Sequence, residues 1–185
     1  MMEKELWVFI ETDSEGKAKN AGLELLNPGA RLAKALGGKL TGVVIGCNVD
    51  EAVKSAAAYG AEKVIVVDGE EYKQYTTDAY ATAFSTLIEK YKPEAILVGA
   101  TVNGRDLGPR VSSRVNTGLT ADCTSLDYDA ESGNIAWTRP AFGGNLMATI
   151  MCPDHRPQIG TVRPGVFKKA EADETRTAEI VKEDI

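Results

Sequence analysis

The chain has 185 residues, of which 43% are hydrophobic and 26% are charged. This composition is typical of a globular domain with a core of its own, and it excludes the disordered and membrane-spanning classes. The formal net charge of −6 disfavours nucleic acid and anionic membranes as partners, because both are bound through clustered lysine and arginine.

The chain begins Met-Met-Glu-Lys-Glu and continues directly into a strand-like run, without the apolar region of a signal peptide. We therefore expect a cytoplasmic protein, with a removed transit peptide as the alternative in a eukaryote. The three cysteines, Cys47, Cys123 and Cys152, are widely separated in apolar runs. They predict buried, reduced thiols, with neither a disulfide framework nor a redox motif.

Four short apolar runs in the first hundred residues alternate with amphipathic helical patterns. The runs are continuously apolar, as strands covered on both faces are, and they lie at residues 6–10, 41–45, 63–67 and 95–99. Helices are predicted between them at 22–36, 50–59 and 77–91. Pro28 either follows an Asn27 cap in a first helical turn or kinks a longer helix. The alternation predicts an α/β domain with a parallel sheet.

A fourth helix is predicted over residues 104–116, where Asp106 precedes Arg110 by the four positions of a helical ion pair. The loop at 101–106 joins a strand to this helix, which is where open α/β sheets bind anions. However, the chain has neither GxGxxG nor GxxxxGK[ST], and Asp106 can itself satisfy the first amides. A structural role is favoured, in which three arginines set the helix against later strands or a partner: Arg105, Arg110 and Arg114.

From residue 120 the pattern changes to short alternating segments. Residues 125–128 and 135–138 predict one β-hairpin. Residues 146–152 and 159–163 predict a second, because the proline-containing turn between them cannot lie in a central strand. We expect these hairpins to extend the sheet as a mixed or antiparallel one.

Two arginines and a glycine-rich turn are the candidate site. Arg139 and Arg163 each precede a proline, which biases their backbone to be extended and carries the guanidinium groups beyond the strand ends. The turn Phe142-Gly143-Gly144-Asn145 lets a flat ring or another backbone come close, and Arg139 can bind carboxylate or phosphate. The alternatives are an Arg163 bound to backbone carbonyls and Asp122, and a tight turn without a binding role.

Catalytic chemistry has no clear residues in this sequence. His155 is the only histidine, so no histidine dyad or multi-histidine metal site can form, and its turn position predicts an exposed or interface residue. Ser112 and Ser113 have no adjacent base. We predict no catalytic residue and no metal site.

Two long segments carry a family resemblance: GATVNGRDLGPRVSSRVNTGLTADCT at 99–124 and TRPAFGGNLMATIMCPDHRPQIGTVRPGVF at 138–167. They are similar to the N-terminal domain of the α subunit of electron-transfer flavoproteins. The resemblance implies a Rossmann-like, three-layer domain of the adenine nucleotide α-hydrolase type, whose parallel sheet is extended by C-terminal β-hairpins. It also implies an electron-carrier subunit that pairs with a β subunit in a heterodimer and is not itself an enzyme.

The cofactor implied by the resemblance is FAD, bound mainly by the β subunit and contacted from this chain. Arg163, within the run TVRPG, would point at that flavin and offset the negative charge of the reduced ring. Arg139, Phe142 and Gly143 are the further residues expected to contact the flavin or the partner chain. Whether the β partner carries FAD or AMP stays open.

The implied redox partners of the complex are acyl-CoA dehydrogenases, ferredoxin or flavodoxin, with NADH as donor in bifurcating versions. Whether this protein bifurcates electrons stays open. Two other functions remain as alternatives: a stand-alone nucleotide-binding protein of the stress-protein type, and a purely structural dimerisation module.

The end of the chain differs in composition from the rest. Residues 168–185 are highly charged, with too few apolar side chains for a helix face. Members of the family carry a second, FAD-binding domain beyond this point. The expected organisation is therefore an α/β domain over 1–167 and a charged linker over 168–185 to an absent FAD domain, in a truncated chain.

Overall fold

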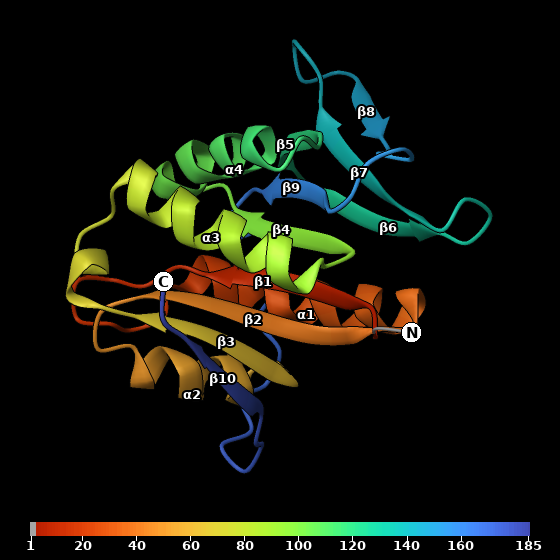
Figure 1. Ribbon diagram of the computed structural model, residues 1–185. Coiled ribbons are helices and arrows are strands. Elements are labelled where there is room, and N and C mark those ends of the chain that lie inside the picture. The colour runs from red at the N-terminus through yellow and green to blue at the C-terminus, as the bar shows by residue number, and fades with distance from the viewer. Residues whose placement is uncertain (1–2) are drawn as a thin grey trace.

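A seven-stranded parallel sheet runs through the computed structural model, which describes residues 3–185, and a separate antiparallel sheet of three strands lies beside it (Figure 1). In chain order the elements are β1 (Glu5–Ile10), α1 (Asn20–Leu36), β2 (Lys39–Gly46), α2 (Asp50–Ala58), β3 (Lys63–Asp68), the 3-10 helix η1 (Glu70–Tyr72), α3 (Thr77–Tyr91), β4 (Ala95–Gly99), α4 (Val102–Arg114), β5 (Leu119–Cys123), β6 (Ser125–Asp129), β7 (Asn134–Pro140), β8 (Met147–Ile150), β9 (Gln158–Val162) and β10 (Glu179–Glu183).

The strand order of the main sheet is β10-β3-β2-β1-β4-β9-β5. The chain adds β2 and β3 on one side of β1 and then crosses to β4 on the other side, so the order reverses between β1 and β4. In open α/β sheets, ligands bind beyond the carboxyl ends of the strands at such a reversal. The three-stranded sheet has the order β6-β7-β8. It lies next to β5, which is the edge strand of the main sheet on the side away from β10.

Side chains of the central strands alternate between two cores. Leu6 and Val8 pack in the core under α1 and α2, whereas Trp7 and Phe9 pack in the core under α3 and α4. The ring of Phe84 in α3 stacks on Trp7 with a centroid distance of 6.2 Å. Because both faces are covered, the central part of each of these strands is mostly apolar. The predicted α/β class with its helix, sheet and helix layers is confirmed.

The helices follow the predicted pattern, and the structure distinguishes between the two alternatives for Pro28. α3 spans the predicted residues, and α4 begins two residues earlier than expected. α1 runs from Asn20 to Leu36 and contains Pro28 in its interior. Pro28 therefore lies in a long helix, and the alternative with an Asn27 cap is wrong.

The predicted ion pair within α4 is also wrong. The Asp106 carboxylate accepts hydrogen bonds from the hydroxyls of Tyr75 and Thr77, both at 2.6 Å, and these bonds lower its pKa. Arg110 instead donates to Asp78 at 2.9 Å. The reason is that α3 packs alongside α4, so partners across the helix pair are better placed than those four residues along it.

One of the two predicted hairpins forms. β6 and β7 pair antiparallel, with Ser125 opposite Thr138. The second hairpin is wrong: β8 pairs antiparallel with β7, while β9 enters the main sheet between β4 and β5, parallel to both. Every residue of β9 is buried, as in an interior strand. The mixed sheet that was expected is therefore two separate sheets, of which the larger is wholly parallel.

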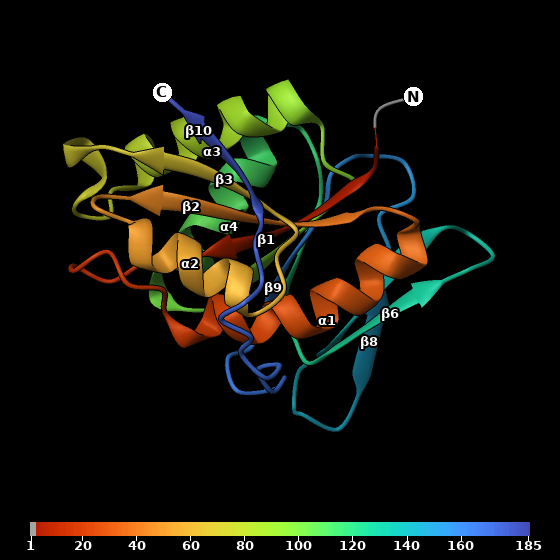
Figure 2. The same ribbon diagram turned by 90° about the horizontal axis from the view of Figure 1, so that it is seen from below.

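The charged segment at 168–185 contains one strand of the main sheet. Its last part forms β10, which pairs parallel with β3 at the edge of the main sheet. Before that, the segment crosses α1 and the end of α2, where Asn27 donates to the Lys168 carbonyl and the Asp173 amide donates to the Ala58 carbonyl (Figure 2). An edge strand needs only one paired side, so a charged sequence can form it.

The three cysteines are all free thiols, but only Cys123 is buried, and burial raises its pKa to about 12. Cys47 and Cys152 are partly exposed, so the prediction that all three are buried is wrong for these two. Within residues 3–185, no helix combines the length and hydrophobicity that crossing a bilayer requires.

Candidate functional site

Asp122 and Arg163 meet at the carboxyl ends of β5 and β9. Arg163 donates from Nε to Oδ1 at 3.2 Å and from Nη2 to Oδ2 at 2.7 Å, a bidentate pair. Arg105, in the first turn of α4, brings its Nη2 to 3.7 Å from Oδ1 of the same carboxylate. Three adjacent strand ends, those of β4, β9 and β5, therefore place these groups at one edge of the sheet.

The backbone of β5 explains how Asp122 reaches this position. Its register against β9 shifts between Thr120 and Cys123, and Asp122 lies in the shift with a φ of 58°, in the left-handed region. Aspartate tolerates this region better than most residues, and bulges of this kind redirect a side chain. The Asp122 amide donates to the Thr161 hydroxyl at 2.9 Å, which fixes the bulge to β9.

The electrostatics of the cluster are dominated by arginine. The hydrogen bonds from Arg163 lower the pKa of Asp122, burial acts against them, and the charges of Arg163, Arg105 and Arg139 lower it further. In turn, Asp122 raises the pKa of Arg163. Arg163 and Arg105 thus share one carboxylate, with the charge of Arg139 acting on it as well, and this part of an otherwise acidic protein is left positive. Such a patch attracts anionic groups. We call Arg105, Asp122, Arg139 and Arg163 the arginine cluster.

Arg139 comes to the cluster from β7, where it lies opposite Ala148 of β8. Its Nε is buried and has no hydrogen-bond partner within residues 3–185. The side chain lines a hollow of about 290 Å³, whose other walls are apolar: Pro140, Ala141, Phe142, Ala148 and Ile150.

The glycine-rich turn joins β7 to β8 and extends away from the main sheet (Figure 1). Phe142 is fully exposed, and Gly143 has a φ of 82° with open space where a β-carbon would lie. Further large apolar side chains on this hairpin are exposed, among them Leu146, Met147 and Ile150. Exposed apolar patches of this kind are typical of interaction surfaces.

The structure thus pairs Arg163 with Asp122, places Arg139 where its charge acts on the same carboxylate, and places Phe142 and Gly143 on the adjoining hairpin. The contact between Arg163 and Asp122 that was expected as the alternative is present. Arg105 was not predicted as part of a site. Its signal in the sequence was its position in the first turn of a helix that directly follows a strand, because such residues lie at the carboxyl edge of the sheet.

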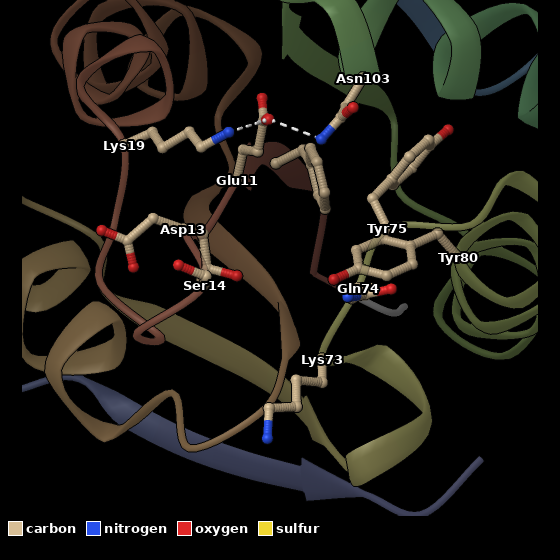
Figure 3. A pocket seen from close by; sticks show the side chains of 11 residues that line it. Glu11, Asp13, Ser14, Lys19, Lys73, Gln74, Tyr75, Tyr80 and Asn103 are labelled. Atoms are coloured by element: carbon tan, nitrogen blue, oxygen red, sulfur yellow. Dashed lines mark hydrogen bonds and ion pairs between the residues drawn. The ribbon is translucent and has the colours of Figure 1, made fainter.

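A second hollow of about 290 Å³ lies at the strand reversal, beyond β1 and β4 (Figure 3). Glu11 occupies its base and is only 6% exposed. Its Oε1 accepts hydrogen bonds from Lys19 at 2.8 Å and from Asn103 at 3.0 Å, and its Oε2 accepts one from the Thr101 hydroxyl at 2.5 Å. Carboxylate oxygens therefore stand where a nucleotide phosphate would approach the start of α4.

The start of α4 is capped by its own chain. The Thr101 hydroxyl accepts a hydrogen bond from the Gly104 amide at 3.0 Å, so Thr101 is the cap and the role expected of Asp106 is wrong. A β-carbon at Gly104 would lie 1.8 Å from the Gly99 carbonyl oxygen, so the helix packs directly on the end of β4. These contacts favour the structural role of residues 101–106 over a phosphate site. Within residues 3–185, no group of three acidic, histidine or cysteine side chains is placed to hold a metal ion.

Comparison with known families assigns this chain to a family. The family model described as "Electron transfer flavoprotein domain" matches residues 6–185. The chain belongs to the electron transfer flavoprotein family, and the resemblance seen in its sequence is confirmed.

Curated relatives agree with this assignment. The chain is 55% identical over 170 residues to "Protein FixB" of Clostridium saccharobutylicum, covering 92% of this chain and 50% of the relative. It is 52% identical over 181 residues to "Electron transfer flavoprotein subunit alpha" of Thermoanaerobacterium thermosaccharolyticum, covering 98% and 54%. It is also 49% identical over 190 residues to "Acryloyl-CoA reductase electron transfer subunit beta" of Anaerotignum propionicum, covering 91% and 52%. The chain spans about half the length of these relatives.

Proposed function

We propose that this chain is the part of an electron-transfer flavoprotein α subunit that pairs with a β subunit and completes the site of a flavin held mainly by that partner. The observation that carries the proposal is the arginine cluster at the carboxyl edge of the sheet, in a family member with no phosphate-binding loop of its own. A display of positive charge beside an exposed apolar hairpin is suited to covering a cofactor that another chain holds.

Arg163 is the residue that would act on the flavin. Asp122 fixes its Nε and Nη2, whereas its Nη1 has no acceptor within residues 3–185, and the side chain is 46% exposed. The guanidinium is therefore held in one orientation with a donor still free, which fits an anionic group approaching from outside. When bound, the flavin supplies the electron-accepting ring, and a fixed positive charge beside it favours the reduced, negatively charged form.

The turn after β7 would approach the same cofactor. Gly143 has open space on its surface, so a flat ring can reach the backbone there, and Phe142 offers an apolar face beside it. Phe142 and Gly143 would cover one side of the cofactor and leave the rest of it to the partner chain. The fit is thus to a flavin shared with another chain, and FAD is the form that the family implies.

The proposal extends to the setting of the complex. We place the heterodimer in the cytoplasm and propose that it carries electrons for enzymes acting on acyl-CoA compounds, with ferredoxin or flavodoxin as the other class of partner. The name of the relative from Anaerotignum propionicum, an acryloyl-CoA reductase electron transfer subunit, supports the first class. Bifurcation from NADH is tested by adding NADH to the purified complex and following the flavin absorbance.

Co-expression of the chain with the β subunit from the same source tests the pairing. We expect the two to elute together as a 1:1 complex with a flavin spectrum and about one FAD per heterodimer. A colourless complex, or failure of the two chains to associate, would contradict the proposal. Two FAD per heterodimer with residues 1–185 intact would contradict the assignment of the flavin to the partner.

The role of Arg163 is tested in that complex. Arg163→Ala should lower the flavin reduction potential, and Arg163→Lys should restore part of it because the charge returns without the planar geometry. Arg176→Ala is the matched control, since Arg176 is similarly exposed but lies before β10. An unchanged potential combined with weaker subunit association would favour a purely structural arginine.

A further inference from the structure

The antiparallel sheet has one face that is covered over only part of its length. Trp137 and Arg139 of β7 point to the same side, since side chains two apart share a face. Ile150 and Ala148 of β8 lie directly opposite them. Trp137 is 1% exposed and packs on β9 at Gly160, where a β-carbon would lie 2.3 Å from its ring.

Two residues further along β7, the same face extends beyond the main sheet. Arg139 and Ala148 are only partly buried there. Ile150, opposite Trp137, is 41% exposed, and Phe142, in the turn after β7, is fully exposed. We call Arg139, Phe142, Ala148 and Ile150 the overhang. A sheet face that is packed at Trp137 and open a few ångströms further on has the geometry of an interface completed by a second molecule.

Arg139 shows which chemistry the second molecule must bring. Its Nε is buried without a hydrogen-bond partner within residues 3–185, and an unpaired donor of a charged group is costly to bury. Asp122 is the carboxylate whose pKa Arg139 affects, but both of its oxygens are already bound by Arg163. Arg139 is only half-buried, so an acceptor on another chain can reach the outer nitrogens of its guanidinium group.

We propose that the overhang receives a segment of the β subunit that carries a carboxylate, which binds Arg139, next to an apolar side chain, which fills the hollow between Phe142 and Ile150. The planar guanidinium group is matched by a carboxylate, and the positive cluster selects acidic partners over basic ones. This inference rests on the proposed function, because it names the contact by which the partner is held.

Position 148 allows a carboxylate of the same chain to be placed in competition with the carboxylate of the partner. Because it lies directly across from Arg139, a glutamate at this position places a carboxylate of the same chain beside the guanidinium. Ala148→Glu should therefore occupy Arg139 and displace the carboxylate of the partner. Ala148→Gln has the same size without the charge, so it separates steric from electrostatic effects.

The dissociation constant between the chain and the purified β subunit is the measurement. Arg139→Gln should weaken binding about tenfold or more, as expected for a lost charge-assisted hydrogen bond. Arg139→Lys should lose less, and Ala148→Glu should weaken binding more than Ala148→Gln does. Arg176→Gln, outside the surface, should bind like the wild type. At saturating β subunit, the flavin content and spectrum of the Ala148→Gln and Arg176→Gln complexes should match those of the wild type.

Other results would overturn the inference. If the dissociation constant of Arg139→Gln is within twofold of the wild-type value, no carboxylate of the β subunit binds Arg139. Undiminished subunit affinity with reduced flavin content would assign Arg139 to the cofactor, and an effect confined to self-association of the chain would assign the overhang to a second copy. If Arg139→Gln does not fold, the comparison of Ala148→Glu with Ala148→Gln decides alone. Failure of the wild-type chain to bind the β subunit contradicts the proposed function itself.

Discussion

Asp122 holds Arg163 through both carboxylate oxygens, and it does so from a left-handed position within a strand. The bulge in β5 aims the carboxylate, and the carboxylate in turn orients the guanidinium. The charge that this chain presents at the edge of the sheet is therefore set by the pair and not by Arg163 alone. Removing Asp122 should increase that charge.

Asp122→Asn is expected to raise the flavin reduction potential in the complex with the β subunit, opposite to Arg163→Ala. Asparagine keeps an oxygen acceptor for Arg163 but removes the negative charge beside it. The exposed pair contributes only about 0.5–1 kcal/mol to stability, so the melting temperature should fall by no more than about 2–4 °C. The potential is measured by spectroscopic titration, and a shift in the same direction as Arg163→Ala would refute the opposing roles.

Gly160 and Trp137 allow a test of how the two sheets are joined. Gly160→Ala places a methyl group 2.3 Å from the Trp137 ring, so the ring must move away from β9. We expect a loss of about 1–3 kcal/mol in unfolding free energy and a red shift of tryptophan fluorescence. Gly118→Ala is the control, because its β-carbon would meet only the Cys152 sulfur at an ordinary 3.7 Å. Equal stability of the two variants would contradict the tight packing.

The sequence was sufficient for the elements whose signals are local. The strands at β1 to β4 are continuous apolar runs, and α3 shows a repeat of three and four residues with a stop at Pro93. β9 was assigned to a hairpin because a period of two indicates which face a residue occupies but not which strand is its neighbour. Gly160 leaves the space in which Trp137 packs on β9. The sequence alone does not show this role, because it depends on β7 and β9 lying side by side.

The candidate site was predicted in part for the same reason. Arg163 and the turn at Gly143 were found from their proline and glycine neighbours, which are local signals. The bulge that aims Asp122 is fixed by Thr161 of β9, and the face that Arg139 shares with Ala148 exists only once β7 and β8 have paired. No local pattern reports these contacts, and Arg105 was missed because its role depends on where β5 ends.

β10 is held in part by hydrogen bonds to Glu183. The charged sequence of residues 168–185 does not indicate these bonds. Glu183 accepts from Lys90 at 2.7 and 2.8 Å and from the Tyr91 hydroxyl, and these hydrogen bonds lower its pKa. Glu183→Gln should speed hydrogen exchange in β10 and cost about 0.5–1 kcal/mol. Lys90→Gln, which removes the cation and leaves Glu183 in place, should show a similar but smaller change.

The pH dependence of that contact has a definite sign. Because the pKa of Glu183 is lower in the folded chain than its ordinary 4.5, the contribution is complete above 4.5 and is lost as the pH falls through the lowered value. The stability difference between wild type and Glu183→Gln should therefore be full at neutral pH and shrink below about pH 4.5. Denaturant titrations at pH 7 and at acidic pH measure it, and a difference that grows on acidification would contradict the assignment.

Glu11 decides between a structural and a nucleotide-binding role for the hollow at the strand reversal. Its buried carboxylate joins Lys19, Thr101 and Asn103, so Glu11→Ala leaves these groups without their acceptor and should cost about 2 kcal/mol or more. Glu11→Gln retains an acceptor oxygen and should cost less. The same carboxylate repels phosphate, so calorimetric titration of the wild-type chain with ATP should give a Kd weaker than about 1 mM. Micromolar binding would instead favour the stand-alone nucleotide-binding function, because a ligand that tight must displace or bypass Glu11.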